Sequence, residues 1–259
     1  MNKEMKNLMK EKLANNKIVY GPWITTSDLD SALILSAVGC DLVMIDGEHG
    51  DMGLETLGRI ITQYRGSKTT PLYRVPWNDL ATVKRALDMG PQGIMFPMIC
   101  SKEEAERAVS YCKYPPLGVR GAVMGSRASL FGVKMKEYMP SANEEILIIA
   151  QIEHVKALEN LDDIITVPGI NVAFFGPFDL SLSMGIPGEL DHPRIDEARK
   201  KLISCCKKHN VIPASVTEPR TMQKDIEMGF KILIGGIDSQ FIFNGAKAML
   251  DQFTSLTNQ

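Results

Sequence analysis

The chain has 259 residues, of which 44% are hydrophobic and 23% are charged, a composition typical of an ordinary soluble globular protein. The formal net charge is −2 and no basic cluster is dense, so we expect no nucleic-acid partner. No apolar run is long enough to span a bilayer, and the N-terminus lacks the pattern of a signal peptide, so we expect no membrane partner. The five cysteines are scattered without metal-ligand spacing, which indicates a reduced, cytoplasmic protein.

Segments with the patterns of strands and helices alternate along the chain. Met1, Met5, Leu8, Met9 and Leu13 recur at helical spacing, which predicts an N-terminal helix packed across one end of the body. Strands are predicted at residues 18–25, 41–46, 70–75, 93–97, 146–152, 172–175, 211–215 and 231–234. Helices are predicted at residues 28–38, 54–64, 79–89, 102–112, around 154–161, from 176, at 194–209, from 219 and from 238.

Three residues mark the ends of these helices. Ser27 and Ser101 are predicted as N-caps, and Gly90 is predicted to stop the helix before it. One connection, at residues 114–132, is long for a compact domain. Connections of that length are usually functional, so we expect residues of this segment to contribute to a site.

Eight strand–helix units with short links predict a closed (β/α)8 TIM barrel, because right-handed crossovers close such a sheet naturally. The alternative is an open doubly wound sheet, which is expected to carry a glycine-rich turn after its first strand. Residues 24–28, Ile-Thr-Thr-Ser-Asp, are not such a turn. We find no interdomain linker or internal repeat, so we expect residues 1–259 to form a single domain.

Two of the predicted strands lead directly to carboxylates. The apolar run at 146–152 is followed by Glu153, and the run at 172–175 is followed by Gly-Pro-Phe and Asp179. In a parallel barrel both carboxylates face the mouth, where they repel each other unless a cation lies between them. Hard oxygen ligands without a cysteine or histidine cluster favour Mg²⁺ or Mn²⁺. The alternative is that each acid caps the next helix or pairs with an arginine.

A histidine and an arginine are predicted to lie on the same face. His49 follows Asp46 by three residues, so that the carboxylate could orient the imidazole for acid–base work. The alternative for His49 is a structural hydrogen bond in a loop. Arg74 ends a strand among apolar residues and therefore needs an anionic substrate or partner. A salt bridge to Asp46 or Glu48 is the alternative for Arg74.

Further polar groups accompany these residues. Residues 176–179 begin a helix whose free N–H groups can receive a carboxylate or enolate oxygen. Arg120 and Arg127 of the long connection are candidates to bind an anionic substrate tail, with solvation as the alternative. Gly235 and Gly236 resemble a phosphate-binding corner, although close packing is the preferred interpretation. The remaining histidines occupy ordinary helix-end or loop positions: His154, His192 and His209.

Six segments carry a family resemblance that extends from about Gly21 to the last helix. They are residues 41–49 (DLVMIDGEH), 71–79 (PLYRVPWND), 83–90 (VKRALDMG), 114–121 (YPPLGVRG), 151–153 (QIE) and 176–181 (GPFDLS). In this order and spacing they resemble the metal-dependent (class II) pyruvate aldolases typified by 4-hydroxy-2-oxoheptanedioate aldolase and 2-dehydro-3-deoxyglucarate aldolase. The resemblance implies a barrel of the phosphoenolpyruvate/pyruvate-binding type.

The resemblance also implies a reaction and its residues. A 4-hydroxy-2-oxo acid is cleaved reversibly to pyruvate and an aldehyde through a metal-stabilised pyruvate enolate, without a Schiff-base lysine. Glu153 and Asp179 are implied to bind the divalent ion, which is Mg²⁺, Mn²⁺ or Co²⁺. Arg74 is implied to stabilise the enolate oxygen, with Gln151 beside the same ligand, and the N–H groups of Phe178 and Asp179 are implied to bind the pyruvate carboxylate. His49, oriented by Asp46, is implied to be the acid–base residue. Trp23 is implied to be the aromatic residue at the end of the first strand, and Asp88 is implied to contact a neighbouring subunit's site.

Members of this family commonly assemble as homohexamers, or trimers of dimers, and exchange their last helix. The resemblance implies an oligomer here, and whether the helix from Asp238 is exchanged is left open. Two mouth loops depart from the family pattern, at residues 50–52 (GDM) and around 214–220 (ASVTEPR). The aldehyde partner is therefore left open.

Two other functions were weighed. An acyl-CoA lyase similar to the citrate and malyl-CoA lyases is expected to need a basic patch for the CoA phosphates, and the sequence shows none. A barrel that binds a small acid without catalysis is disfavoured by the joint presence of His49, Arg74, Glu153 and Asp179.

Overall fold

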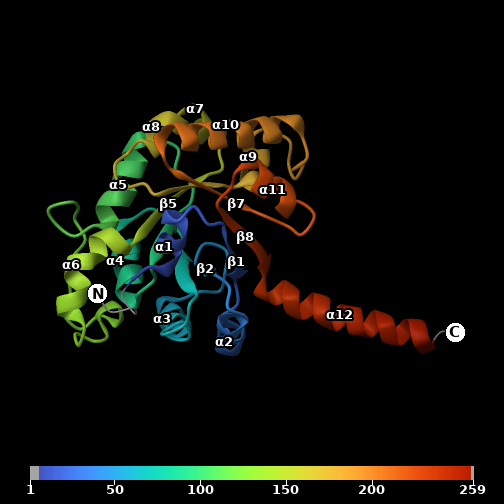
Figure 1. Ribbon diagram of the computed structural model, residues 1–259, viewed down its shortest axis with the longest axis horizontal. Helices are drawn as coiled ribbons and strands as arrows, with labels where there is room; N and C mark the ends of the chain where they lie inside the picture. Colours follow the sequence, from blue (N-terminus) through green and yellow to red (C-terminus); the bar gives the residue numbers. More distant parts are fainter. Residues whose placement is uncertain (1–5, 258–259) are drawn as a thin grey trace.

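The computed structural model describes residues 6–257 (Figure 1). Within this range eight strands pair in parallel and in chain order, and β1 (Val19–Ile24) pairs with β8 (Ile232–Ile237), so the sheet closes. The predicted barrel is confirmed, and the ladder between β1 and β8 excludes the open doubly wound sheet. The predicted positions of Met1 and Met5 lie outside the described residues.

The predicted strands are all present, and their ends differ from the expected ones by at most three residues. The remaining strands are β2 (Leu42–Asp46), β3 (Thr70–Arg74), β4 (Gly93–Phe96), β5 (Leu147–Ile152), β6 (Val172–Phe175) and β7 (Ile212–Val216). The helices are α1 (Leu8–Ala14), α2 (Leu29–Val38), α3 (Leu54–Thr62), α4 (Leu80–Met89), α5 (Lys102–Cys112), α6 (Met135–Glu145), α7 (Val155–Glu159), α8 (Leu161–Ile165), α9 (Pro177–Ser183), α10 (Pro193–His209), α11 (Met222–Met228) and α12 (Asp238–Thr257), with a 3₁₀ turn, η2 (Arg127–Ser129).

The predicted helix ends are correct in two of three cases. The Ser101 side chain accepts a hydrogen bond from the Glu104 N–H, and Gly90 has the left-handed backbone that ends α4. The N-cap of α2 is Asp28 rather than Ser27, because the Asp28 carboxylate accepts from the Ser31 N–H over 2.7 Å. Both residue types cap helices well, so composition alone does not separate neighbouring candidates.

Two helices were not predicted. The segment expected as one helix around residues 154–161 is two, α7 and α8. The long connection between α5 and β5 contains η2 and then α6, which has Pro140 in its interior. A proline at such a position lacks the N–H that a helix uses and is a strong sequence signal against one. The packing of α6 outweighs that signal.

Side chains that alternate along the strands fill the inside of the barrel. The inward layers contain Leu42 and Met44 of β2, Leu72 of β3 and Ile149 of β5, all buried. Helix α1 closes the N-terminal end, where Met9 joins this inner cluster. The predicted N-terminal helix across one end of the body is therefore confirmed. Because side chains repeat every two residues in a strand, the next inward positions lie at the opposite end, the mouth.

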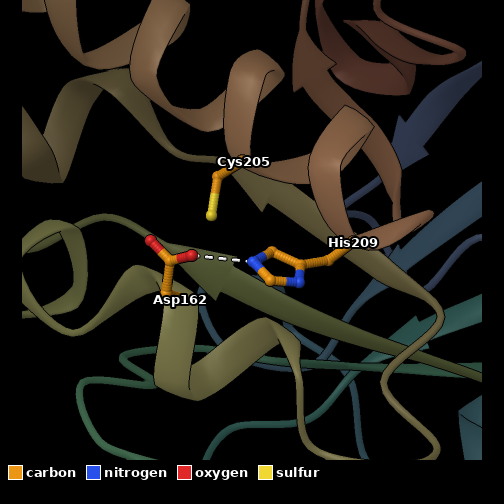
Figure 2. Close-up of side chains that lie close together, drawn as sticks. All are labelled: Asp162, Cys205 and His209. Atoms are coloured by element: carbon orange, nitrogen blue, oxygen red, sulfur yellow. Dashed lines mark hydrogen bonds and ion pairs between the residues drawn. The ribbon is translucent and has the colours of Figure 1, made fainter.

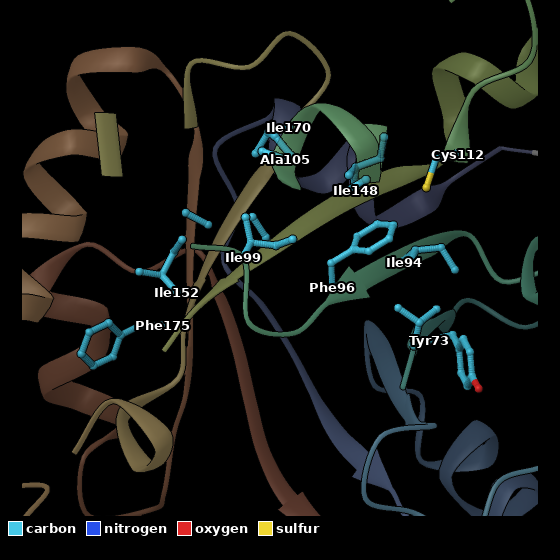
Figure 3. Close-up of a cluster of buried hydrophobic side chains, with 14 of the residues drawn as sticks. Tyr73, Ile94, Phe96, Ile99, Ala105, Cys112, Ile148, Ile152, Ile170 and Phe175 are labelled. Atoms are coloured by element: carbon cyan, nitrogen blue, oxygen red, sulfur yellow. The ribbon is translucent and has the colours of Figure 1, made fainter. Parts of the chain in front are cut away.

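The outward side chains of the strands pack against the surrounding helices in a second, larger cluster (Figure 3). Phe96, Ile148, Ile152 and Phe175 are fully buried in it. Each such side chain contributes roughly 1.5–3 kcal/mol of transfer free energy. Strands covered on both faces explain why the sequence shows continuous apolar runs rather than alternation.

The last helix leaves the body of the barrel. In Figure 1, α12 extends away from β8 with the C-terminus at its far end. Only Asp238, its first residue, is buried among the described residues of this helix. Its exposed apolar side chains are Phe241, Ile242, Phe243, Met249, Leu250, Phe253 and Leu256. No helix in the range 6–257 combines the length and apolarity needed to cross a membrane.

Candidate active site

The ends of β2 and β3 bring Asp46 and Arg74 side by side, because the two residues are partners in the ladder. Arg74 Nε donates to Asp46 Oδ1 over 2.9 Å, and Nη2 donates to Oδ2 over 2.7 Å. Nη1 lies 3.0 Å from Glu48 Oε2. This bidentate ion pair is buried, since the exposed fraction is 9% for Arg74 and 2% for Asp46. The structure thus forms the salt bridges that were the alternative interpretation of Arg74.

An aromatic side chain completes the surroundings of Arg74. Trp23 lies at the end of β1, and Arg74 Cζ is 4.5 Å from its ring centroid, within the range of a cation–π contact. Trp23 in turn meets Phe174 edge to face, with centroids 6.1 Å apart. A guanidinium held by two carboxylates and a ring is fixed in position, which is the requirement for a group that stabilises negative charge on a substrate.

His49 lies at the mouth, but Asp46 does not hold its imidazole. The imidazole is 67% exposed, and Nε2 is 3.9 Å from Glu48 Oε2. Asp46 meets His49 only through the backbone, where the His49 N–H donates to Oδ1 over 3.3 Å. The expected orientation of the ring by Asp46 is therefore absent, because Arg74 occupies both oxygens of that carboxylate. Glu48 is the carboxylate nearest to the ring.

Glu153 is a buried carboxylate just beyond β5. Its Oε1 accepts a hydrogen bond from the Met98 N–H over 2.8 Å, and its Oε2 accepts one from the Gln151 side chain. Met98 has φ = 54°, a conformation that is costly for a residue with a side chain and that recurs at functional sites. Burial, together with the negative charges of Glu48 and Asp179, raises the pKa of Glu153 to about 7.

Three carboxylates therefore interact at the mouth: Glu48, Glu153 and Asp179. Burial and the charges of Asp46 and Asp179 also raise the pKa of Glu48. The buried Gln151 Oε1 has no hydrogen-bond partner among the described residues. A buried carboxyl whose pKa is raised partly by neighbouring negative charges, together with an unpartnered buried oxygen, fits a divalent cation with oxygen ligands. This chain's residues thus fit the ion that the resemblance implies.

The junction of β6 and α9 is shaped around Glu153. A Cβ atom on Gly176 would lie 2.8 Å from the Glu153 Cβ and 2.9 Å from Oε2, so a larger residue would push the carboxylate away. Asp179 lies in the first turn of α9. Because the N-cap residue is Gly176, no N-cap side chain accepts a hydrogen bond from the N–H groups of that turn. Phe178 is exposed. The start of α9 therefore lies beside Glu153, as the sequence predicts.

The raised pKa of Glu153 gives a prediction for the metal-free protein. A folded pKa of about 7, against the ordinary value of 4.5 for a glutamate, means that folding favours the protonated form. The resulting stabilisation, about 3 kcal/mol, is fully present below pH 4.5 and is lost as the pH rises through about 7. The unfolding free energies of the metal-free wild type and of Glu153→Gln should be measured with denaturant at several pH values. Relative to Glu153→Gln, the wild type should lose about 3 kcal/mol of stability as the pH rises from 4.5 to about 7. Parallel pH profiles for the two proteins would contradict the assignment.

Arg120 and Asp88 meet in a different place. Arg120 is 1% exposed, its Nη2 donates to Asp88 Oδ1 over 3.3 Å, and Cζ lies 4.4 Å from the Tyr114 ring centroid. Asp88 lies in the last turn of α4, which leads to the N-terminal end of β4 and so away from the mouth. Arg120 thus contacts Asp88 and Tyr114 rather than the ends of the strands, and its predicted substrate contact stays a prediction. The predicted subunit contact of Asp88 stays a prediction.

Sequence reasoning missed two groups at the mouth and one elsewhere. Glu48 was considered only as a partner of Arg74, although it follows a strand end as closely as His49 does. The Met98 N–H carries no sequence signal, because any residue has one. Outside the mouth, the structure joins Asp162, Cys205 and His209 into one cluster, although His209 and the cysteines had been interpreted as ordinary.

A family model described as HpcH/HpaI aldolase/citrate lyase matches residues 20–245. The chain belongs to this family. It is 31% identical over 256 residues to the 4-hydroxy-2-oxo-heptane-1,7-dioate aldolase of Salmonella dublin, a match that covers 98% of this chain and 97% of the relative. Membership confirms the predicted resemblance and makes the chain an enzyme of the aldehyde-lyase class.

Solved structures agree with this assignment. The HpcH/HpaI aldolase of Desulfitobacterium hafniense DCB-2 superposes with a TM-score of 0.88 at 31% identity, covering 95% of this chain and 96% of that one. The citrate synthase SbnG superposes with a TM-score of 0.87 at 27% identity, covering 96% and 98%. Proteins named for different reactions thus share this barrel over its whole length.

Proposed function

We propose that this HpcH/HpaI family member is a divalent-metal-dependent aldolase that cleaves a 4-hydroxy-2-oxo acid to pyruvate and an aldehyde. The observation that carries the proposal is the buried Glu153, whose pKa the charges of Glu48 and Asp179 help to raise, together with an arginine that is held in place. The name of the Salmonella dublin relative agrees with this reaction class. The substrate acid in this chain is either 4-hydroxy-2-oxoheptanedioate or a related compound such as 2-dehydro-3-deoxyglucarate.

Glu153 and Asp179 would hold Mg²⁺, Mn²⁺ or Co²⁺, which would stabilise negative charge on the substrate oxygens as a Lewis acid. Arg74 stabilises charge on the C2 oxygen with a guanidinium that Asp46 and Trp23 fix in position. Gln151 offers its unpartnered Oε1 to the same region. The first-turn N–H groups of α9, at Phe178 and Asp179, would receive the substrate carboxylate.

His49 handles the proton in this proposal. Its exposed imidazole takes the proton of the C4 hydroxyl, directly or through a water molecule. The C3–C4 bond then breaks, the aldehyde leaves, and the electron pair passes to the C2 oxygen beside Arg74. A proton returned to C3 gives the methyl group of pyruvate. Glu48, 3.9 Å from Nε2, is the carboxylate available to stabilise the protonated imidazole.

The proposal is tested by assaying the purified chain with pyruvate and a panel of short aldehydes, with and without a terminal carboxylate. EDTA should abolish the aldol reaction and Mn²⁺ or Mg²⁺ should restore it, whereas borohydride with pyruvate should leave activity unchanged because no lysine forms a Schiff base. Inactivation by borohydride, or full activity in EDTA, would contradict the mechanism. Turnover of acyl-CoA thioesters alone would support the lyase alternative.

We further propose that the chain forms a homo-oligomer, a hexamer or trimer of dimers, through α12. A helix with seven large apolar side chains exposed is not expected to remain uncovered in water. Helix α2 also exposes Leu33, Ile34 and Val38. Apolar surfaces of this kind on two separate elements fit a contact in which α12 of one copy packs on another copy.

Removing residues 239–259 should lower the mass of the particle in solution, as measured by light scattering. The full chain is expected to be oligomeric, and Phe253→Glu is expected to weaken the assembly without shortening the helix. The matched control is Lys247→Glu on the polar side of the same helix. A monomeric full chain, or an unchanged mass after truncation, would contradict the role of α12.

A cytoplasmic location is also part of the proposal. All five cysteines are free, as expected for a reducing compartment. Fractionation of cells that produce the chain would test this, and recovery outside the cytoplasmic fraction would contradict it.

A further inference from the structure

A second group of metal-ligand side chains lies on the outer layer of helices. Asp162 belongs to α8, while Cys205 and His209 belong to α10. Cys205 and His209 are four residues apart and therefore lie on one face of α10. Figure 2 shows the Cys205 sulfur pointing into the space between the Asp162 carboxylate and the His209 ring. None of these residues belongs to the mouth, because His209 ends α10 just before the N-terminal end of β7.

The donor atoms are already close together. One sulfur, one imidazole nitrogen and one carboxylate oxygen all lie within 4.8 Å of one another. His209 Nε2 is 2.7 Å from Asp162 Oδ1, and the Cys205 sulfur lies within 4.8 Å of both the carboxylate and the imidazole. In a tetrahedral zinc site the ligand bonds are about 2.0–2.3 Å long. Neighbouring ligand atoms are then farther apart than the 2.7 Å between His209 and Asp162 and closer than the 4.8 Å limit for the whole group. Small side-chain movements would therefore bring all three onto one ion.

The simplest alternative is a surface ion pair. Lys208 Nζ lies 2.6 Å from Asp162 Oδ1, and the hydrogen bond that it donates lowers the pKa of Asp162. However, the side chains of Asp162 and Lys208 are 54% and 66% exposed, and such pairs contribute little to stability. Displacing Lys208 by a dication would cost correspondingly little. An ion pair also gives no reason for a buried thiol to point at the carboxylate.

We propose that Asp162, Cys205 and His209 form a second metal site, for a borderline-soft divalent ion such as Zn²⁺, with water as the fourth ligand. Thiolate and imidazole ligands select Zn²⁺ over Mg²⁺, so this site differs in kind from the all-oxygen site at the mouth. The exposed carboxylate gives the ion a path from solvent. A bound ion would connect α8 to α10 on the outside of the barrel.

Binding at this site releases one proton. Burial raises the pKa of the Cys205 thiol to about 11, so the metal-free side chain is a thiol and not an activated nucleophile. The ion replaces the thiol proton, which passes to the buffer, and a sulfur–metal bond forms.

Co²⁺ is the probe, because a thiolate–Co²⁺ charge-transfer band reports sulfur ligation, whereas Glu153 and Asp179 at the mouth offer only oxygen atoms. Titration of the full-length metal-free protein should produce this band in the wild type and in Glu153→Gln, and Zn²⁺ should remove it by displacement. Cys205→Ala should lose the band, whereas the matched control Cys206→Ala, a buried cysteine on the same helix, should keep it.

The two other ligands provide variants that do not depend on the buried cysteine. Asp162→Asn and His209→Gln change side chains at least partly open to solvent, and each should weaken Co²⁺ affinity by about 100-fold or more, beyond the usual effect of changing a supporting residue. A wild type without the band, a band that survives in Cys205→Ala, or a band indifferent to both Asp162→Asn and His209→Gln would overturn the site.

Discussion

Replacing Glu153 with glutamine should lower kcat by about 10³-fold or more, because the metal ion supplies several kcal/mol of charge stabilisation that is lost with its ligand. The change keeps the shape of the side chain and an oxygen that can accept from the Met98 N–H. It also removes a buried carboxyl whose ionised form is costly. The variant should therefore be folded and at least as stable as the metal-free wild type above pH 7. Asp179→Asn should reduce kcat similarly.

Controls separate the ligand role from a general effect of charge. Glu159→Gln and Asp163→Asn make the same chemical changes at exposed positions on α7 and α8 and should leave kcat and KM unchanged. Calorimetric titration with Mn²⁺ should show that Glu153→Gln has lost metal affinity together with turnover. A variant that keeps wild-type affinity for Mn²⁺ and full activity would refute the assignment of Glu153.

The second large effect concerns His49. His49→Ala should lower the aldol rate by about 10²–10⁴-fold, the range for the loss of an acid–base group. The side chain is 67% exposed, so its removal should not alter the fold. The loss should appear in kcat rather than in the affinity for pyruvate, because His49 acts on the hydroxyl of the other half of the substrate. Steady-state kinetics in both reaction directions measure this.

His192→Ala is the matched control for His49, since the His192 ring nitrogen caps α10 by accepting from the Arg194 N–H over 3.1 Å. It should cost about 1 kcal/mol of stability at most as a lost cap and leave the aldol rate unchanged. Kinetics of His49→Ala that match the wild type would exclude His49 from the chemistry. The task of proton transfer would then pass to Glu48, the neighbouring carboxylate.

Much of the site follows from the strand pattern in the sequence. Because side chains alternate along a strand, Asp46, Arg74 and Gln151 continue the inward series that Met44, Leu72 and Ile149 begin. Their convergence at the mouth was predictable once eight parallel strands were recognised. The same reasoning placed Glu153 and Asp179 together, and it needed no knowledge of side-chain contacts.

The choice between rival partners was not predictable. Asp46 could face either His49 or Arg74, and both lie within reach of the end of β2. The register between β2 and β3 decides which residue pairs with Asp46, because it makes Asp46 and Arg74 direct partners. The sequence pattern alone does not give that register. A two-pronged bond to a guanidinium then leaves the imidazole free in solvent.

Contacts between helices were harder still to predict. Asp162 precedes Cys205 by more than forty residues, so their cluster depends on how α8 packs on α10. Arg120 appeared in a long loop and was expected near a substrate, yet it is enclosed by Tyr114, Tyr138 and Asp88. A loop position gives no indication of burial when the loop is itself packed.

The most direct test of the central claim is the location of Mn²⁺ in crystals of the full chain soaked with Mn²⁺ and pyruvate. An anomalous difference peak within ligand distance of both Glu153 and Asp179, with pyruvate oxygens adjoining it, is the expected result. A well-ordered mouth that shows no such peak, or pyruvate bound there without any ion, would contradict it.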